Sequence, residues 1–149
     1  EHGRRKDICK ECGGSSICEH GRRKDICKEC GGSRICPHGR EKNLCKECDP
    51  LGHLTNIVRS RVYDALKNDK ELASSEYLGC DIGTFKKHIE GQFTKGMSWD
   101  NHGEWHIDHI VPLKYDNPTL EETCERLHYT NTQPLWATEN MAKGNRFIG

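Results

Sequence analysis

The sequence predicts a protein of the α+β class. An N-terminal array of short zinc-bound Cys3His repeats, with little regular structure, is expected to precede helices and a C-terminal core. The chain has 149 residues with ten cysteines and nine histidines, only 33 % of it is hydrophobic, and its formal net charge is zero. Chains this poor in apolar residues are usually disordered and strongly charged, so a neutral one does not fit simple disorder. Metal ions are therefore expected to replace part of a hydrophobic core.

Charge is distributed unevenly along the chain. Residues 1–48 contain 12 Lys and Arg against 8 Asp and Glu, whereas residues 49–149 contain 11 against 15. A basic N-terminal part followed by an acidic C-terminal part is typical of a nucleic-acid-binding arm joined to a domain with metal-binding carboxylates. No run of about 18 apolar residues occurs, and no signal peptide is recognised. An intracellular protein with no membrane partner is therefore expected.

The first 48 residues repeat with a period of 18. Residues 1–12 return unchanged as residues 19–30, and again in altered form as residues 37–48. Each unit carries only one or two aliphatic residues, which stand directly before a cysteine, and so little apolar surface cannot offset the entropy of ordering the unit. Tetrahedral zinc is therefore expected to hold the repeats, because Cys-x-x-Cys pairs aim two thiolates at one ion.

Two groupings of these residues supply four zinc ligands per site. One grouping is Cys-x2-Cys-x5-Cys-x-His, and the other is Cys-x-His-x6-Cys-x2-Cys. We favour the second, since the first leaves Cys45 and Cys48 with only His53 within reach. The second grouping gives two complete zinc sites, with the ligands Cys18, His20, Cys27 and Cys30, and Cys36, His38, Cys45 and Cys48.

A third zinc site of the second grouping is incomplete. His2, Cys9 and Cys12 lack one cysteine, which the repeat register puts before Glu1 if the chain has been trimmed. A disulfide framework is the alternative to zinc, but the regular placement of histidines argues against it. The Gly-Arg-Arg-Lys loop at residues 21–24 and its copies suit phosphate contact, with a merely solvated loop as the alternative.

Two helices are expected between the array and the C-terminal segment. Residues 49–52 have turn chemistry and end the array. Apolar residues from about 54 to 66 follow a helical stripe, and the basic residues Arg59, Arg61 and Lys67 fall on other faces. A second helix is expected from about Ile82 to Phe93, with Asp81 as its N-cap. The expected division of the chain is thus an array at 1–50, a helical connection at 51–95 and a core at 96–149.

The last third of the chain carries the most specific motifs. Residues 105–113 are Trp-His-Ile-Asp-His-Ile-Val-Pro-Leu, and residues 129–136 are Tyr-Thr-Asn-Thr-Gln-Pro-Leu-Trp. Ala-Thr-Glu-Asn follows at 137–140, and Lys-Gly-Asn-Arg at 143–146. In this order, these elements resemble the HNH (ββα-metal) endonuclease family of phages and large DNA viruses. The resemblance implies two short strands and a helix around one metal ion. The array is similar to short Cys/His repeats found beside nuclease domains in large DNA viruses.

Phosphodiester hydrolysis explains the residue types in these motifs. Asp108 supplies a hard carboxylate oxygen of the kind that Mg²⁺ accepts. His109 points to the opposite face of the strand and can take a proton from water as general base. By resemblance, Asn140 is the second metal ligand, and its oxygen favours Mg²⁺ or Mn²⁺ over zinc. Asn131, also by resemblance, braces the loop and orients the catalytic histidine.

The segment departs from the family pattern in two respects. Thr132 stands where many relatives have leucine, and no Cys-x-x-Cys pairs bracket the motif. The core is therefore expected to rely on Trp99, Trp105, Leu113, Leu135 and Trp136. His106 shares the face of Asp108 and is expected to have a supporting role.

These features together predict a metal-dependent endonuclease that acts on double-stranded DNA. The zinc repeats would add affinity for DNA. One site cuts one strand, so a monomer would nick, and a double-strand break would need a homodimer or two successive cuts. The alternative is a non-catalytic, zinc-organised DNA-binding or packaging protein. In a third interpretation, the repeats bind protein instead of DNA.

Overall fold

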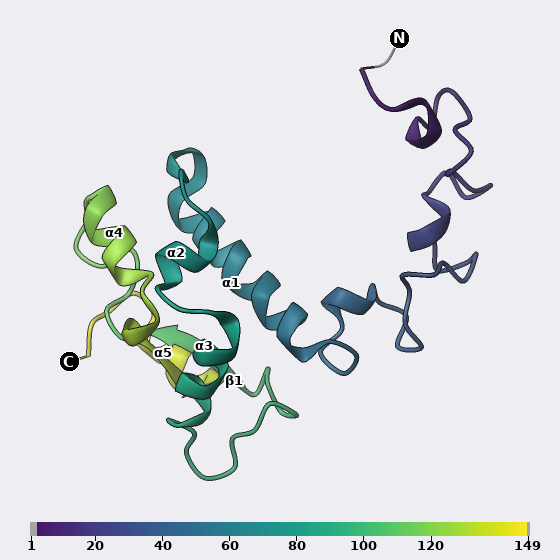
Figure 1. Cartoon of the computed structure of the whole chain (residues 1–149). Helices are drawn as coiled ribbons and strands as arrows, with labels where there is room; N and C mark the ends of the chain where they lie inside the picture. Colours follow the sequence, from purple (N-terminus) through teal and green to yellow (C-terminus); the bar gives the residue numbers. More distant parts are fainter. Residues whose placement is uncertain (1–2, 149) are drawn as a thin grey trace. The chain divides into compact units, whose positions relative to one another are not determined.

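The protein, seen here in a computed structural model that describes residues 3–148, divides into two compact units, Glu1–His53 and Leu54–Gly149 (Figure 1). The predicted mixed class is confirmed, because several helices accompany one small sheet. The helices and strands are α1 Pro50–Leu66, α2 Ser74–Leu78, α3 Ile82–Glu90, β1 Trp105–His109, α4 Leu120–Arg126, β2 Thr132–Trp136 and α5 Ala137–Lys143. No helix in the described residues is long and apolar enough to cross a membrane.

Residues 3–49 of the first unit contain short turns in place of α-helices and strands. One 3₁₀ turn recurs in each repeat, as η1 Lys6–Ile8, η2 Lys24–Ile26 and η3 Lys42–Leu44. Backbone hydrogen bonds join successive repeats, from Lys24 N to Ser16 O and from Lys42 N to Arg34 O, both at 2.8 Å. A Cβ atom at Gly32 would lie 2.4 Å from Asp25 O, so this close backbone approach requires glycine.

The helix α1 begins earlier than its apolar stripe predicts, and the turn expected at residues 49–52 was wrong. The Asp49 side chain accepts the N–H of Gly52 at 2.8 Å, and the Asp49 carbonyl accepts the N–H of His53 at 2.9 Å. An aspartate cap followed by proline at the first helical position starts a helix. The stripe itself is as predicted, and its buried members are Leu54, Val58, Val62 and Leu66.

The helix α3 begins where predicted and ends sooner. Asp81 is its N-cap, and the side chain of Asp81 accepts the N–H of Thr84 at 2.9 Å. The helix stops at Glu90 because glycine, a poor helix former, follows at position 91. Phe93 therefore lies in the turn beyond the helix, where its ring packs 4.9 Å from that of Trp105.

The two strands form an antiparallel sheet that is followed directly by α5. The register pairs Asp108 with Gln133, and α5 contacts both strands. Trp105 and Ile107 are 0 % and 3 % exposed and face the core. Because strand side chains alternate, His106 and Asp108 lie on the opposite face, where they meet α5.

One hydrophobic core serves all of the second unit, so the helical connection and the C-terminal core do not separate at residue 95. Its buried residues are Leu54, Val58, Val62, Leu66, Leu78, Phe85, Ile89, Trp105, Ile107 and Leu127. The physical reason is that a two-stranded sheet is marginal alone and needs helices packed against it. Of the residues expected in this core, Trp105 is fully buried, Trp99, Leu113 and Trp136 pack against the cluster, and Leu135 is half-buried.

Candidate functional site

Two clusters of cysteine and histidine in the first unit could hold zinc. In each cluster the ligand atoms lie within 4.8 Å of one another. Their members are those of the second grouping: Cys18, His20, Cys27 and Cys30, and Cys36, His38, Cys45 and Cys48. His20 Nδ1 lies 3.8, 3.6 and 3.3 Å from the sulfurs of Cys18, Cys27 and Cys30. Tetrahedral zinc bonds of about 2.3 Å to sulfur and 2.0–2.1 Å to nitrogen give nitrogen–sulfur edges of about 3.6 Å, so the first cluster has the size that zinc requires.

The second cluster has the same dimensions. His38 Nδ1 lies 3.8 Å from the sulfur of Cys36 and 3.4 Å from those of Cys45 and Cys48. In both clusters the same ring nitrogen, Nδ1, faces the three sulfurs. Each Cys-x-His segment therefore presents its histidine in the same way toward the following Cys-x-x-Cys pair.

The thiols within a cluster ionise unequally. Burial opposes ionisation of Cys18, but backbone hydrogen bonding from Arg22 and contact with His20 outweigh it and lower the pKa of Cys18 to about 6. Contact with the Cys27 thiol raises the pKa of Cys30 to about 12. Crowded thiols cannot all ionise without a cation between them. Zinc binds thiolates and releases their protons, so it would remove this conflict.

The third predicted site is described only in part. Cys9 is buried and Cys12 is exposed, whereas His2 lies outside the described residues. The eight cysteines from Cys18 onward are free thiols. This state fits metal binding and does not fit a disulfide framework.

The arginines of the basic loops are partly paired within the array. Arg23 donates to the carboxylate of Asp25 at 3.1 and 2.7 Å, and Arg22 lies 3.5 Å from Glu29. These side chains remain exposed, and exposed ion pairs are weak. A phosphate could therefore replace the neighbouring carboxylates as partner of these arginines, because breaking the exposed ion pairs costs little free energy.

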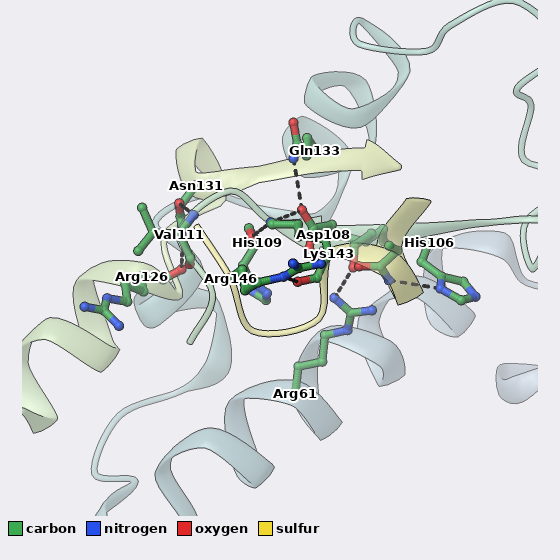
Figure 2. A network of polar contacts seen from close by, with 12 residues as sticks. Arg61, His106, Asp108, His109, Val111, Arg126, Asn131, Gln133, Lys143 and Arg146 are labelled. Atoms are coloured by element: carbon green, nitrogen blue, oxygen red, sulfur yellow. Dashed lines mark hydrogen bonds and ion pairs between the residues drawn. The ribbon is translucent and has the colours of Figure 1, made fainter. Parts of the chain in front are cut away.

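In the second unit, Asp108 lies at a buried interface between β1 and α5 (Figure 2). Its side-chain oxygen Oδ2 accepts hydrogen bonds from Gln133 Nε2 at 2.9 Å and from Lys143 Nζ at 2.5 Å. Lys143, 4 % exposed, also donates to the backbone carbonyl of His109 at 2.5 Å. No donor among the described residues reaches Oδ1 of Asp108. One oxygen of this carboxylate is thus satisfied internally, and the other stays open.

Asn140 lies at the same interface. Its side-chain amide is 3.0 Å from His106 Nδ1. Asn140 and Lys143 are three residues apart and share one face of α5. Across from them, His106 and Asp108 share one face of β1. The structure thus brings Asp108 and Asn140, both predicted as metal ligands, to one interface, together with His106.

His109 lies on the other face of β1, as the strand alternation predicts. Burial, and then the nearby charge of Arg61, lower the pKa of His109 from 6.5 to about 4. The imidazole is therefore neutral near pH 7 and can accept a proton. It borders a cavity of about 330 Å³ on the side of α1.

Sequence reasoning missed two charged residues of this site. The expectation that Arg61 falls on a face away from the apolar stripe was wrong, because Arg61 (Figure 2) is half-buried and donates to the backbone carbonyl of Ile107. Arg61 follows Leu54 by seven residues, a spacing that returns to the buried stripe and could have revealed it. Lys143 follows Asn140 by three residues, which is an equally readable signal of a shared helix face.

Asn131 fastens the segment that follows His109. Its Oδ1 accepts the N–H of Val111 at 2.9 Å, and its Nδ2 donates to the carbonyls of Val111 at 3.0 Å and of Arg126 at 2.8 Å (Figure 2). The Asn131 carbonyl accepts the N–H of Ile110 at 2.9 Å. Three of these bonds hold the segment after β1 against the turn before β2, and the fourth joins that turn to the end of α4, which is the arrangement expected of a brace.

Asn131→Ala is expected to lower the free energy of unfolding of the second unit by about 2–4 kcal/mol. Three side-chain hydrogen bonds would be lost, and the partly buried backbone groups of Val111 and Arg126 would be left without them. Urea denaturation followed by tryptophan fluorescence measures this change. Asn145→Ala, at an exposed position, is the control. Equal stability of the two variants would show that Asn131 is not a brace.

Two proteins of Acanthamoeba polyphaga mimivirus are similar to this chain. "Uncharacterized protein L426" is 39 % identical over 98 residues, and "Uncharacterized protein L246" is 34 % identical over 98 residues. Each match covers 64 % of this chain and 43 % of the relative, so the chain spans less than half the length of these relatives. No protein-family model matches the chain, and no solved structure matches it. The comparisons therefore assign no activity to the chain.

Proposed function

We propose that the second unit is a metal-dependent endonuclease of the HNH type, which hydrolyses phosphodiester bonds in double-stranded DNA. One observation carries the proposal. Two antiparallel strands and the helix directly after them bring Asp108 and Asn140 to one interface, with the neutral imidazole of His109 next to Asp108 in the chain. The resemblance of residues 96–149 to HNH nucleases implies two short strands and a helix around one metal ion, and this arrangement supports the proposal.

Asp108 and Asn140 are the residues that would hold a divalent cation. Their side chains offer hard oxygen donors of the kind that Mg²⁺ and Mn²⁺ prefer, and Oδ1 of Asp108 is open. When bound, the cation supplies a Lewis acid to the phosphate and lowers the pKa of water. Lys143 and Gln133 fix the orientation of the Asp108 carboxylate through its other oxygen.

His109 is the general base in this proposal. Its lowered pKa keeps the ring neutral at pH 7, which leaves a nitrogen lone pair free for a proton of the attacking water, and the same low pKa makes it a weaker base than an ordinary histidine. Asn131 and Lys143 act through its backbone, because Asn131 fixes the two residues that follow and Lys143 binds the His109 carbonyl. They are positioning residues.

The zinc array supplies DNA affinity in this proposal. Its exposed basic loops contact backbone phosphates, which gives binding without sequence preference and with strong salt dependence. One nuclease site per chain cuts one strand. A double-strand break then requires a homodimer or two successive cuts.

The test of the proposal is nicking of supercoiled plasmid with Mg²⁺, without it, and with EDTA. We expect Mg²⁺-dependent nicking that Asp108→Ala or Asn140→Ala reduces by at least about tenfold, as loss of one ligand weakens binding of the ion. Glu139→Ala is the matched control, because Glu139 is the exposed neighbour of Asn140 on α5. Nicking that continues in EDTA would rule out the metal mechanism.

A non-catalytic, zinc-organised DNA-binding or packaging protein is the second candidate function. The ion pair between Lys143 and Asp108 favours it, because it neutralises the carboxylate without any metal. In the same plasmid assay this candidate predicts retarded plasmid and no nicked product at any Mg²⁺ or Mn²⁺ concentration.

A further inference from the structure

Arg61 is a half-buried arginine without an acidic partner. Its guanidinium donates to the Ile107 carbonyl, but no carboxylate oxygen in the described part of the chain lies within 4.0 Å of it. Asp108, the acidic residue whose charge acts on Arg61, is itself paired with Lys143 at 2.5 Å. Burial lowers the pKa of Arg61, which means that its charge lacks full compensation. Buried charges are normally paired, so this guanidinium is suited to an anion from outside the chain.

The space beside Arg61 can admit such an anion. The cavity of about 330 Å³ that borders His109 is also lined by Arg61 and by Lys114, an exposed cation in the loop after β1. A volume of this size lies within the range of small-molecule sites, about 300–1,000 Å³. The cavity therefore brings two cations and a neutral imidazole to one opening.

The rest of the cavity is largely apolar. Ala65, Leu113 and Pro118 form part of its wall, and Asp64 is its single acidic lining residue. Apolar surface next to a cationic end suits a molecule with one charged and one uncharged part. A nucleotide has this division between its phosphate and its sugar and base.

We propose that this cavity is a nucleotide subsite, in which Arg61 and Lys114 bind a backbone phosphate of the nucleic acid and the apolar wall holds the attached nucleoside. The inference rests on the proposed nuclease function and names the part of the site that holds the substrate strand. A guanidinium binds phosphate through two parallel hydrogen bonds, and a lysine adds a point charge. Arg61 thereby fixes the strand beside His109.

Binding of thymidine 5′-monophosphate to the full chain tests the subsite. The titration is followed by NMR in magnesium-free buffer, without chelator so that zinc stays bound. Arg61→Met, which keeps the apolar stem, is expected to weaken binding about 10- to 100-fold, the range for loss of hydrogen bonds to a charged group. Arg59→Met, an exposed neighbour on the same helix, should bind within about twofold of the wild type.

Additional ligands and variants define which part of the nucleotide is bound and test whether the variants are folded. Thymidine and inorganic phosphate should each bind more weakly than the nucleotide, and Lys114→Met should weaken the nucleotide less than Arg61→Met. Arg61→Lys keeps the charge and should keep part of the affinity. Thermal unfolding of each variant shows whether the second unit is folded. Should Arg61→Met misfold, the intermediate affinity of Arg61→Lys still tests the role of the guanidinium.

The outcomes separate this subsite from the nuclease activity. Equal nucleotide affinity of Arg61→Met and Arg59→Met overturns the subsite, even where the wild type nicks plasmid with Mg²⁺. Loss of nucleotide binding in Arg61→Met supports the subsite, even where plasmid nicking is absent and the nuclease proposal fails. Shifts confined to the zinc array would also overturn it.

Discussion

His109→Ala is expected to lower the plasmid-nicking rate about 10²–10⁴-fold, the usual cost of losing a general base. DNA affinity should stay nearly unchanged, because the neutral imidazole contributes little charge to binding. The measurement is single-turnover nicking of supercoiled plasmid at saturating protein, together with a separate binding titration. The two readouts distinguish lost chemistry from lost binding.

The control for this prediction is a histidine outside the site. His128 lies beside a different cavity, with Glu76, Leu120 and Glu125, so His128→Gln should nick at the wild-type rate. Near-normal nicking by His109→Ala would refute the assignment of the base. Equal loss of nicking in both variants would point to damage to the fold.

Removal of zinc is expected to unfold the array and leave the second unit folded. The repeats have almost no apolar core, so metal binding supplies their folding free energy, about 10–16 kcal/mol for a structural zinc site at pH 7. Residues 13–48 should bind two zinc ions per chain. Cys27→Ser should remove one of these ions, and Cys45→Ser the other. Metal analysis counts the ions, and NMR resolves which unit loses its structure.

Cys124→Ser is the control for these variants, because Cys124 packs against the core of the second unit and belongs to neither cluster. Cys27→Ser should still nick plasmid, but with weaker DNA binding and a shallower salt dependence if the basic loops contact phosphates. A complete site formed by Cys9, Cys12, Cys18 and His20 would show that the first grouping is correct. Disulfides between the array cysteines in a non-reducing digest would remove the zinc interpretation.

The sequence alone determined the local features of this protein. The period of the repeats and the Cys-x-His and Cys-x-x-Cys spacings predicted both zinc clusters, because the four ligands of each site lie close together in the chain. The cap at Asp81 and the apolar stripe of α1 were also readable, since capping and helical periodicity depend on neighbours in the chain. Strand alternation likewise predicted that Asp108 and His109 face opposite sides.

Only the tertiary structure decided which charges meet. Lys143 pairs with Asp108 across 35 residues of sequence, and Arg61 reaches Ile107 across 46. No local pattern fixes such contacts, because they depend on how α1 and α5 pack against the two strands. The early start of α1 and the single core of the second unit have different causes. A proline that usually marks a turn became the first residue of a helix, and the small sheet gained its stability by packing against α1 and α3.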